Sequence, residues 1–211
     1  MKYKTIVILA PHTDDAELGC GGSMARMIEE GADIHVIVFS IAKESVPNGY
    51  KKDQLKTEFL NSMEVMGIPE ENITIFDYPV RMLNYKRQDI LQELVNLKDQ
   101  INPDLVLIPS SQDVHQDHQV VQMEGLRAFK NFTVLGYELP WNHITFSAQH
   151  FIKLERKHLD LKWKCLQEYT TQLNLKRSYF TEEFIFGLSK VRGTQIGYDY
   201  AEAYEVFRII D

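Results

Sequence analysis

Long apolar stretches are missing from this sequence. A helix that crosses a membrane needs about 20 consecutive apolar residues, and no run of that length occurs in the 211 residues. Lys2 and Lys4 do precede an apolar segment, but it has only the length of a strand before Pro11, too short for the core of a signal peptide. We therefore expect no membrane span, no secretion signal and a cytoplasmic protein.

Cysteine is also scarce. Cys20 and Cys165 are the only two, and two thiols supply neither a disulfide framework nor a zinc knuckle. The simplest interpretation is that both are small buried side chains in a protein of a reducing compartment.

An excess of positive charge is absent. The net charge of −7 gives no broad basic surface, which argues against nucleic acid as the main partner.

Low-complexity stretches, repeats and linker-like shifts in composition are missing too. A chain of this length can build one sizeable core, so we predict a single α/β domain over 1–211, with 140–211 as a C-terminal extension of that domain. Nothing in the sequence marks a subunit interface, and assembly into a homo-oligomer stays open.

Strand-like and helix-like segments alternate along the first two thirds of the chain. Apolar, often β-branched runs predict strands, and amphipathic segments that stop at glycine or before proline predict helices. The expected strands are 5–10, 34–39, 73–76, 105–108 and 134–137, and the expected helices are 18–30, 54–66, 87–100 and 118–129. This alternation is typical of a Rossmann-like open sheet of mainly parallel strands with helices on both faces. In the last third we expect helices over 159–169 and 182–190, a loop from 193 to 197 and a final strand over 204–210.

Two short polar segments follow two of the expected strands. Residues 11–15, Pro-His-Thr-Asp-Asp, come after the strand 5–10, and residues 113–118, Asp-Val-His-Gln-Asp-His, come after the strand 105–108. Functional sites of parallel sheets are built at the carboxyl ends of the strands. We therefore expect the histidines and aspartates of both segments to converge there.

The first use of these side chains is metal binding. His12, Asp15 and His118 offer imidazole nitrogen and carboxylate oxygen, a ligand set that suits zinc and does not exclude ferrous iron. Three protein ligands leave a position for water, which is the arrangement of a catalytic site. The alternative for a single histidine at a strand end is a hydrogen-bonded loop residue, but two acid–histidine clusters on one sheet favour the metal.

The remaining side chains of the two segments can supply acid–base chemistry. Asp14 can take a proton from a metal-bound water as general base, or it can cap the following helix. His115 can act as acid and oxyanion partner, with Asp117 orienting it and raising its pKa; the alternative for Asp117 is a helix N-cap. For Asp113 two interpretations are equally good: a carboxylate that supports a metal ligand through a hydrogen bond, or an ordinary loop residue. No residue is assigned to an organic cofactor.

Three further features have a functional and a plainer interpretation. The segment Gly19-Cys20-Gly21-Gly22 superficially suggests a phosphate cradle, but the acidic cluster before it favours close packing. The polar-aromatic loop from Tyr137 to His143 could line a substrate pocket or be an ordinary surface loop. Glu58, Arg81 and Lys86 are candidate substrate contacts, although solvated charge is the simpler interpretation for each.

The two segments resemble the motifs of a known family. Residues 11–22, Pro-His-Thr-Asp-Asp-Ala-Glu-Leu-Gly-Cys-Gly-Gly, are similar to the opening motif of the PIG-L/LmbE-like zinc-dependent N-deacetylases, usually Ala/Pro-His-Pro-Asp-Asp-Glu followed by a Gly-rich segment. Residues 115–118, His-Gln-Asp-His, look like the family's second motif, His-x-Asp-His. Thr13 replaces the common Pro, and Ala16 replaces the common Glu. The Ala-Glu-x-Gly-Cys-Gly-Gly variant looks like the branch that acts on sugar–thiol precursors.

The resemblance implies a Rossmann-like fold and hydrolysis of an N-acetyl group, typically on an amino sugar. It carries zinc ligation to His12, Asp15 and His118, the general base to Asp14, and the acid and oxyanion role to His115 with Asp117 as its partner. The expected function is therefore a metal-dependent hydrolase that removes an N-acetyl group from a small amino sugar or sugar conjugate by attack of metal-bound water. The alternatives are a non-catalytic Rossmann-like nucleotide- or sugar-binding module with a vestigial metal site, and a metal enzyme for a different amide or ester.

Overall fold

The computed structural model describes residues 3–210. The strands are β1 (Thr5–Ala10), β2 (Asp33–Val38), β3 (Ile73–Ile75), β4 (Leu105–Pro109), β5 (Thr133–Tyr137), β6 (His150–Leu154) and β7 (Tyr200–Arg208). The helices are α1 (Asp15–Glu29), α2 (Gln54–Met66), α3 (Arg87–Ile101), α4 (Gln116–Ala128), α5 (Arg156–Gln167), α6 (Thr170–Asn174) and α7 (Glu182–Thr194). Short 3-10 helices lie at η1 (Lys43–Ser45), η2 (Glu70–Asn72), η3 (Leu83–Lys86) and η4 (Pro140–Asn142).

The seven strands form one sheet in the order β3-β2-β1-β4-β5-β7-β6. The first five strands in this order are parallel to one another. Strand β7 is antiparallel to both of its neighbours, β5 and β6. The mainly parallel, Rossmann-like sheet expected from the sequence is confirmed. Because the order reverses between β1 and β4, the helices that follow these two strands leave toward opposite faces, which opens a crevice at their carboxyl ends.

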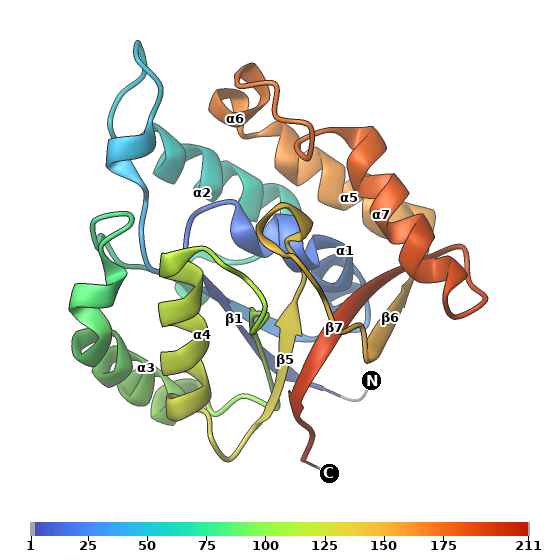
Figure 1. Ribbon diagram of the computed structural model, residues 1–211, viewed down its shortest axis with the longest axis horizontal. Helices are drawn as coiled ribbons and strands as arrows, with labels where there is room; N and C mark the ends of the chain where they lie inside the picture. The colour runs from blue at the N-terminus through green and yellow to red at the C-terminus, as the bar shows by residue number, and fades with distance from the viewer. Residues whose placement is uncertain (1–2, 211) are drawn as a thin grey trace.

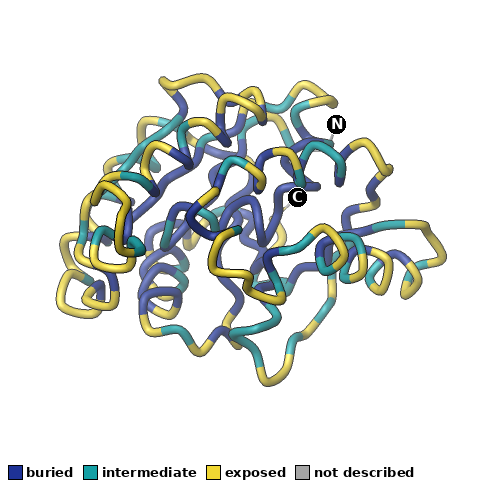
Figure 2. Tube along the Cα trace, turned by 90° about the horizontal axis from the view of Figure 1, so that it is seen from above, coloured by how far each residue is buried: buried dark blue, intermediate teal, exposed yellow. Residues whose placement is uncertain are grey.

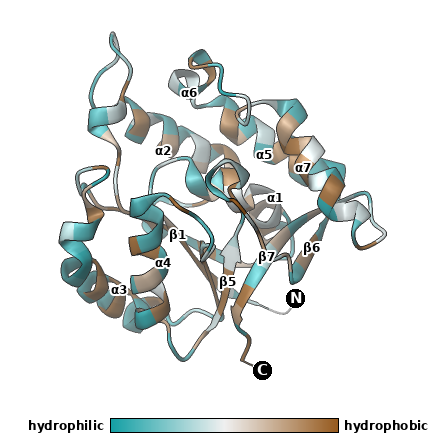
Figure 3. Cartoon of the chain, in the orientation of Figure 1, coloured by the Kyte–Doolittle hydropathy of each residue, from teal (hydrophilic) through white to brown (hydrophobic). Residues whose placement is uncertain are grey.

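Helices lie over both faces of the sheet (Figure 1), and an apolar core is packed on each face. Alternate residues of β1 point to opposite faces: Ile6 and Ile8 join the core under α1, α2, α5 and α7, while Val7 and Leu9 join the core under α3 and α4. The trace through the centre of the molecule is buried and the connecting loops are mostly exposed (Figure 2). The central strand β1 is mainly hydrophobic, whereas β6, β7 and the outer helices carry both hydrophobic and hydrophilic stretches (Figure 3).

Helix ends follow the local chemistry of the sequence. Helix α2 ends at Gly67, whose φ of 85° lies in the left-handed region that glycine reaches without cost. Helix α3 ends at Asn102 with φ of 48° directly before Pro103, and asparagine tolerates this conformation better than most side chains. The expected bounds of both helices therefore agree with the structure to within a residue.

The last third of the chain departs from the sequence expectation. Strand β6 and the short helix α6 were not expected, and Gly193 lies inside α7 rather than in a loop. A Cβ at Gly193 would stand 2.7 Å from backbone atoms of Asp199 and Tyr200, so this glycine permits a close approach of α7 to β7 and does not break the helix. The final strand also begins earlier than expected, at Tyr200.

No helix within residues 3–210 is long and apolar enough to cross a membrane. Strands β6 and β7 extend the same sheet that begins at β1. We accordingly propose that 140–211 belongs to the same domain as the rest of the chain.

Candidate active site

The two polar segments meet at the carboxyl ends of β1 and β4. These strands are parallel neighbours, with Ile8 beside Leu107. His12 follows β1, and Asp14 and Asp15 stand at the start of α1, while His115 and His118 stand at the start of α4. The convergence expected from the sequence is therefore present, at the point where the strand order reverses.

Three donor atoms in this cluster form a small triangle. His12 Nδ1 lies 3.1 Å from Asp15 Oδ2, His118 Nε2 lies 3.3 Å from the same oxygen, and the two nitrogens are 3.3 Å apart. Ligands at zinc–nitrogen and zinc–oxygen distances of about 2.0–2.1 Å in a tetrahedral arrangement are themselves roughly 3.3 Å apart. The residues present fit a divalent metal in both donor chemistry and spacing.

In each of the two histidines of the triangle, the other ring nitrogen contacts a buried carboxylate. His12 Nε2 lies 3.0 Å from Asp117 Oδ2, and His118 Nδ1 lies 2.7 Å from Asp113 Oδ2. A proton on these remote nitrogens leaves the lone pairs of His12 Nδ1 and His118 Nε2 directed into the triangle. This carboxylate–histidine arrangement is the usual support of histidine ligands to metals.

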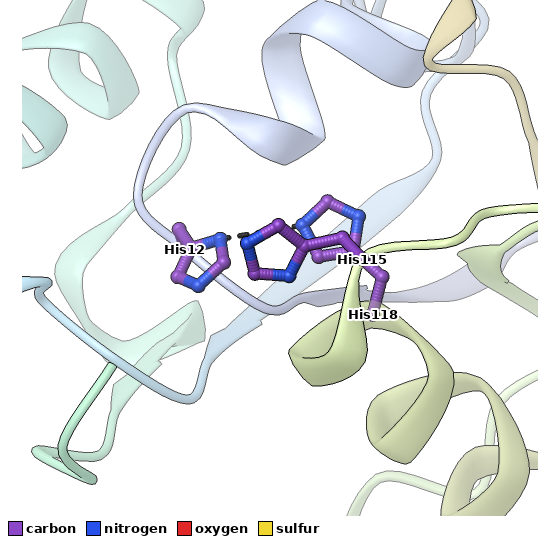
Figure 4. A group of neighbouring side chains, drawn as sticks. All are labelled: His12, His115 and His118. Carbon is purple, nitrogen blue, oxygen red and sulfur yellow. Dashed lines mark hydrogen bonds between the residues drawn. The ribbon is translucent and has the colours of Figure 1, made fainter. Parts of the chain in front are cut away.

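His115 lies beside the triangle, and together with His12 and His118 it forms a second set of side chains that could hold a metal ion. His12, His115 and His118 each place one ring nitrogen within 4.8 Å of the others (Figure 4). His115 Nδ1 accepts the backbone N–H of Asp117 at 3.2 Å, so in the neutral ring the hydrogen is carried by Nε2. That nitrogen can donate a hydrogen bond to a substrate oxygen.

The electrostatics of the cluster favour a bound cation. Burial alone would lower the pKa of His12, but hydrogen bonds to Asp117 and Asp15 outweigh it and raise the pKa to about 9. Burial likewise opposes protonation of His118, yet the charge of Asp15 and the bond to Asp113 raise its pKa to about 10. Burial also opposes ionisation of Asp15, but His118 holds its pKa well below the usual range. The carboxylates therefore draw positive charge into the site, which a metal ion can supply in place of protons.

Asp14 is next to this cluster but differs from Asp15 in its contacts. It occupies the N-cap position of α1 without a side-chain capping bond, so the capping alternative is wrong. Asp14 lines the cavity, and burial, together with the charge of Asp15, raises the pKa of its carboxyl to about 6. A carboxyl that changes protonation near neutral pH is suited to acid–base work.

A cavity of about 340 Å³ opens beside the cluster. Its wall combines residues 12–15, His115 and His118 with residues of several helices and loops: Leu18, Ala42, Ser45, Leu55, Val80, Arg81, Trp141, Asn142, Gln172, Arg177 and Tyr179. Trp141 stacks on Tyr179 with ring centroids 3.8 Å apart. Of the loop from Tyr137 to His143, for which pocket wall and surface loop were both open, Trp141 and Asn142 line the cavity, whereas Tyr137 is buried and its hydroxyl donates to the carbonyl of Leu9.

Comparison with known families agrees with this geometry. Residues 7–129 match the family model of PIG-L, described as GlcNAc-PI de-N-acetylase. The chain belongs to the PIG-L family. The matched segment runs from β1 to the end of α4 and so contains both polar segments. The family resemblance noted in the sequence is confirmed.

Individual PIG-L relatives cover most of the chain. An uncharacterized deacetylase of Escherichia coli K12, YaiS, is 26% identical over 175 residues, which is 80% of this chain and 91% of that protein. The N,N'-diacetylchitobiose deacetylase of Pyrococcus horikoshii has the same fold, with a TM-score of 0.79 at 17% identity over 97% of this chain and 84% of that one. A 4-oxalmesaconate hydratase of Pseudomonas putida is 26% identical over 54% of this chain and 47% of its own length.

One expected contact within the site is wrong. The carboxylate of Asp117 does not orient the His115 ring; it accepts from His12 and from the backbone N–H groups of Arg81 and Leu83. Asp117 does favour protonation of His115, but burial and the charges of His118 and His12 dominate and lower the pKa of His115 to about 4. His115 is therefore a neutral hydrogen-bond donor near pH 7. The N-cap alternative for Asp117 is also wrong, because His115 occupies that position.

Glu17, Glu58 and the glycine segment have structural roles. Glu17, which follows the unusual Ala16, is buried and accepts from Ser62 and Tyr169 at 2.5 and 2.6 Å, and burial raises its pKa to about 7. Glu58 is buried against Thr170 and Thr171. A Cβ at Gly22 would lie 2.6 Å from Leu154, so the glycine segment serves close packing, as expected.

Sequence reasoning missed the contribution of the last third of the chain. Gln172, Arg177 and Tyr179 line the cavity from α6 and the segment after it. No spacing rule marks them, because they reach the site only through the packing of α5 on α1 and α2. Of the two stacked rings, only Trp141 lies in a loop that the sequence marks as a candidate pocket wall.

Proposed function

We propose that this protein is a zinc-dependent N-deacetylase of the cytoplasm that acts on an amino sugar or sugar conjugate. The observation that carries the proposal is the triangle of His12 Nδ1, Asp15 Oδ2 and His118 Nε2 next to a carboxyl of Asp14 that caps no helix. His12, Asp15 and His118 would hold the metal, for which ferrous iron is an alternative. Two buried, unpaired cysteines support a reducing compartment.

The residues divide the chemistry of amide hydrolysis among them. A bound divalent metal lowers the pKa of water and polarises a carbonyl oxygen. Asp14, ionised above pH about 6, takes the proton of the attacking water and returns it to the departing amine nitrogen. His115 donates from Nε2 to the oxygen of the acetyl carbonyl as negative charge develops there. The products are a free amine and acetate.

The substrate class follows from the family and the cavity. The family description and two of the relatives name deacetylases, one of them of diacetylchitobiose. The cavity presents an aromatic stack, Trp141 on Tyr179, and aromatic faces with nearby polar groups suit sugar rings. An N-acetylated sugar is therefore proposed over an acetylated peptide.

A substrate screen with metal analysis tests the proposal. The purified protein is loaded with zinc or ferrous iron and offered N-acetylated sugars, nucleotide sugars, sugar–thiol precursors and acetylated peptides. We expect about one metal per chain, and free amine and acetate in equal amounts from a sugar substrate. Absence of stoichiometric metal would favour the binding module. Turnover of peptides but not of sugars would contradict the substrate class. Turnover without acetate would point to chemistry such as that of the hydratase relative.

Replacing Asp113 by Asn should weaken metal binding without removing a ligand. Asp113 holds His118 Nδ1 at 2.7 Å and the backbone N–H of His115 at 2.9 Å. Loss of such a supporting carboxylate costs roughly 10–100-fold in metal affinity, which a competition titration with a chelator measures. Asp33→Asn is the matched control, since Asp33 lies 3.2 Å from His35 outside the site. Equal affinities in the two variants would contradict the supporting role of Asp113.

A further inference from the structure

Arg81 has an unusual backbone conformation for its residue type. Its φ is +65°, in the left-handed region that favours glycine and asparagine. Four residues other than glycine show positive φ within 3–210, namely Ala42, Arg81, Asn102 and Lys176. Of these, Ala42 and Arg81 line the cavity, and only Arg81 carries a charge. A strained residue of this kind at a site is held there by its surroundings and warrants a functional explanation.

The conformation of Arg81 is fixed by a carboxylate of the metal cluster. The backbone N–H of Arg81 donates to Asp117 Oδ2 at 2.5 Å, and the same oxygen lies 3.0 Å from His12 Nε2. Leu83 N–H donates to Asp117 Oδ1 at 3.3 Å. One buried carboxylate thus positions both a proposed metal ligand and the backbone that presents the Arg81 side chain.

The guanidinium of Arg81 has no protein partner within residues 3–210. The seven other arginines of the chain each have a side-chain bond or ion pair: Arg26, Arg87, Arg127, Arg156, Arg177, Arg192 and Arg208. Arg177, the other arginine in the cavity wall, donates to the hydroxyl of Tyr179. Arg81 is exposed and lines the cavity, and its guanidinium brings five hydrogen-bond donors that no protein group within 3–210 engages.

We infer that Arg81 binds an anionic group, a carboxylate or a phosphate, of the N-acetylated substrate. The acidic residues of the cavity wall do not compensate Arg81, because Asp15 contacts His12 and His118 and Asp14 is assigned to proton transfer. A guanidinium pairs with either anion through two parallel hydrogen bonds. This inference rests on the proposed function and refines its substrate from an amino sugar to an acidic sugar conjugate.

The test compares anionic and neutral substrates on matched variants. The zinc-loaded protein is assayed for free amine with N-acetylglucosamine 1-phosphate, N-acetylmuramic acid and the neutral methyl glycoside of N-acetylglucosamine. Arg81→Asn removes the guanidinium but keeps a residue that tolerates positive φ. Lys86→Asn is the control, since Lys86 is an exposed cation outside the cavity wall.

We expect Arg81→Asn to lower kcat/KM for the anionic substrates on the order of tenfold or more, the effect of one charge-assisted hydrogen bond. The value for the neutral substrate should stay within about twofold, and Lys86→Asn should change neither. The phosphate and the carboxylate substrate show which anion is preferred. Equal losses on anionic and neutral substrates, or no loss on either, would overturn the inference.

A binding measurement keeps the inference testable if the proposed function fails. Glucosamine 6-phosphate and glucosamine carry no acetyl group, and their binding to the zinc-loaded protein is measured by calorimetry. We expect the phosphate to bind more tightly to the wild type and to lose that advantage in Arg81→Asn. If no acetylated sugar is turned over but this difference is present, the deacetylase assignment fails and the anion site stands. If the difference is absent, the anion site fails whatever the turnover.

Discussion

Replacing Asp14 by Asn is expected to lower kcat by on the order of a hundredfold or more while the protein keeps its metal. The substitution removes the proposed general base, and positioned bases contribute about 10²–10⁴-fold. The three donors of the triangle, His12, Asp15 and His118, are untouched. The effect should appear in kcat more than in KM, because the base acts on water and not on substrate binding.

The matched variant is His118→Ala, which removes a donor from the triangle. Its metal content should fall along with its activity, since two protein ligands would remain. Metal analysis and steady-state kinetics on both purified variants distinguish the two effects. An Asp14→Asn protein that has lost its metal, or that retains full turnover, would show that the roles of the adjacent aspartates are assigned wrongly.

The same assignment predicts the pH dependence of the wild type. Burial and the charge of Asp15 raise the pKa of Asp14 to about 6, and a base must be ionised to accept a proton. Activity should therefore rise with pH through this range and be lost as pH falls below about 6. The residual activity of Asp14→Asn should lack this acidic limb, and an unchanged limb would assign it to another group.

Much of the fold could be predicted because, in the first two thirds of the chain, the local sequence patterns favour the same strands and helices that the packed sheet requires. The bounds of β1 and α2 are as expected, since a buried apolar run and a glycine-terminated amphipathic helix are unambiguous patterns. The positions of His12 and His118 followed from the same patterns, because parallel strands end at one edge.

The contacts within the site could not be predicted from the spacing of residues in the sequence, because they join residues that only the folded chain brings together. Asp117 is two residues from His115 in sequence, yet its carboxylate contacts His12, 105 positions away, because it stands in the first turn of a helix that faces β1. The pKa of His115 was expected to rise and instead falls, since burial and two neighbouring histidines outweigh the carboxylates of Asp15 and Asp117. Solvated charge was the simpler interpretation for Arg81, and only its backbone conformation and its unpaired guanidinium indicate a role.

A buried ion pair satisfies the backbone groups at a kink in α1, the helix that begins at Asp15. Cys20 has non-helical angles, φ −144° and ψ 16°. In an unbroken helix the N–H of Gly22 would donate to the carbonyl of Leu18. Here Gly22 N–H donates to Glu202 Oε1 at 3.0 Å, and the Leu18 carbonyl accepts from Lys162 Nζ at 2.8 Å. Lys162 and Glu202 are 2.6 Å apart and only 3% and 6% exposed, so the pair satisfies both halves of the broken bond away from water.

Removing one member of this pair should therefore cost about 3–5 kcal/mol of the free energy of unfolding, a large share of the stability of a typical domain. Lys162→Met leaves the Glu202 carboxylate buried without its cation, and urea denaturation measures the loss. The double variant Lys162→Met with Glu202→Gln removes both charges but keeps an oxygen that can accept from Gly22, and it should recover most of the loss. The control is Asp199→Ala, which breaks the exposed pair of Lys190 and Asp199 and should cost no more than about 1 kcal/mol. A Lys162→Met protein as stable as this control would show that the kink in α1 needs no buried charge.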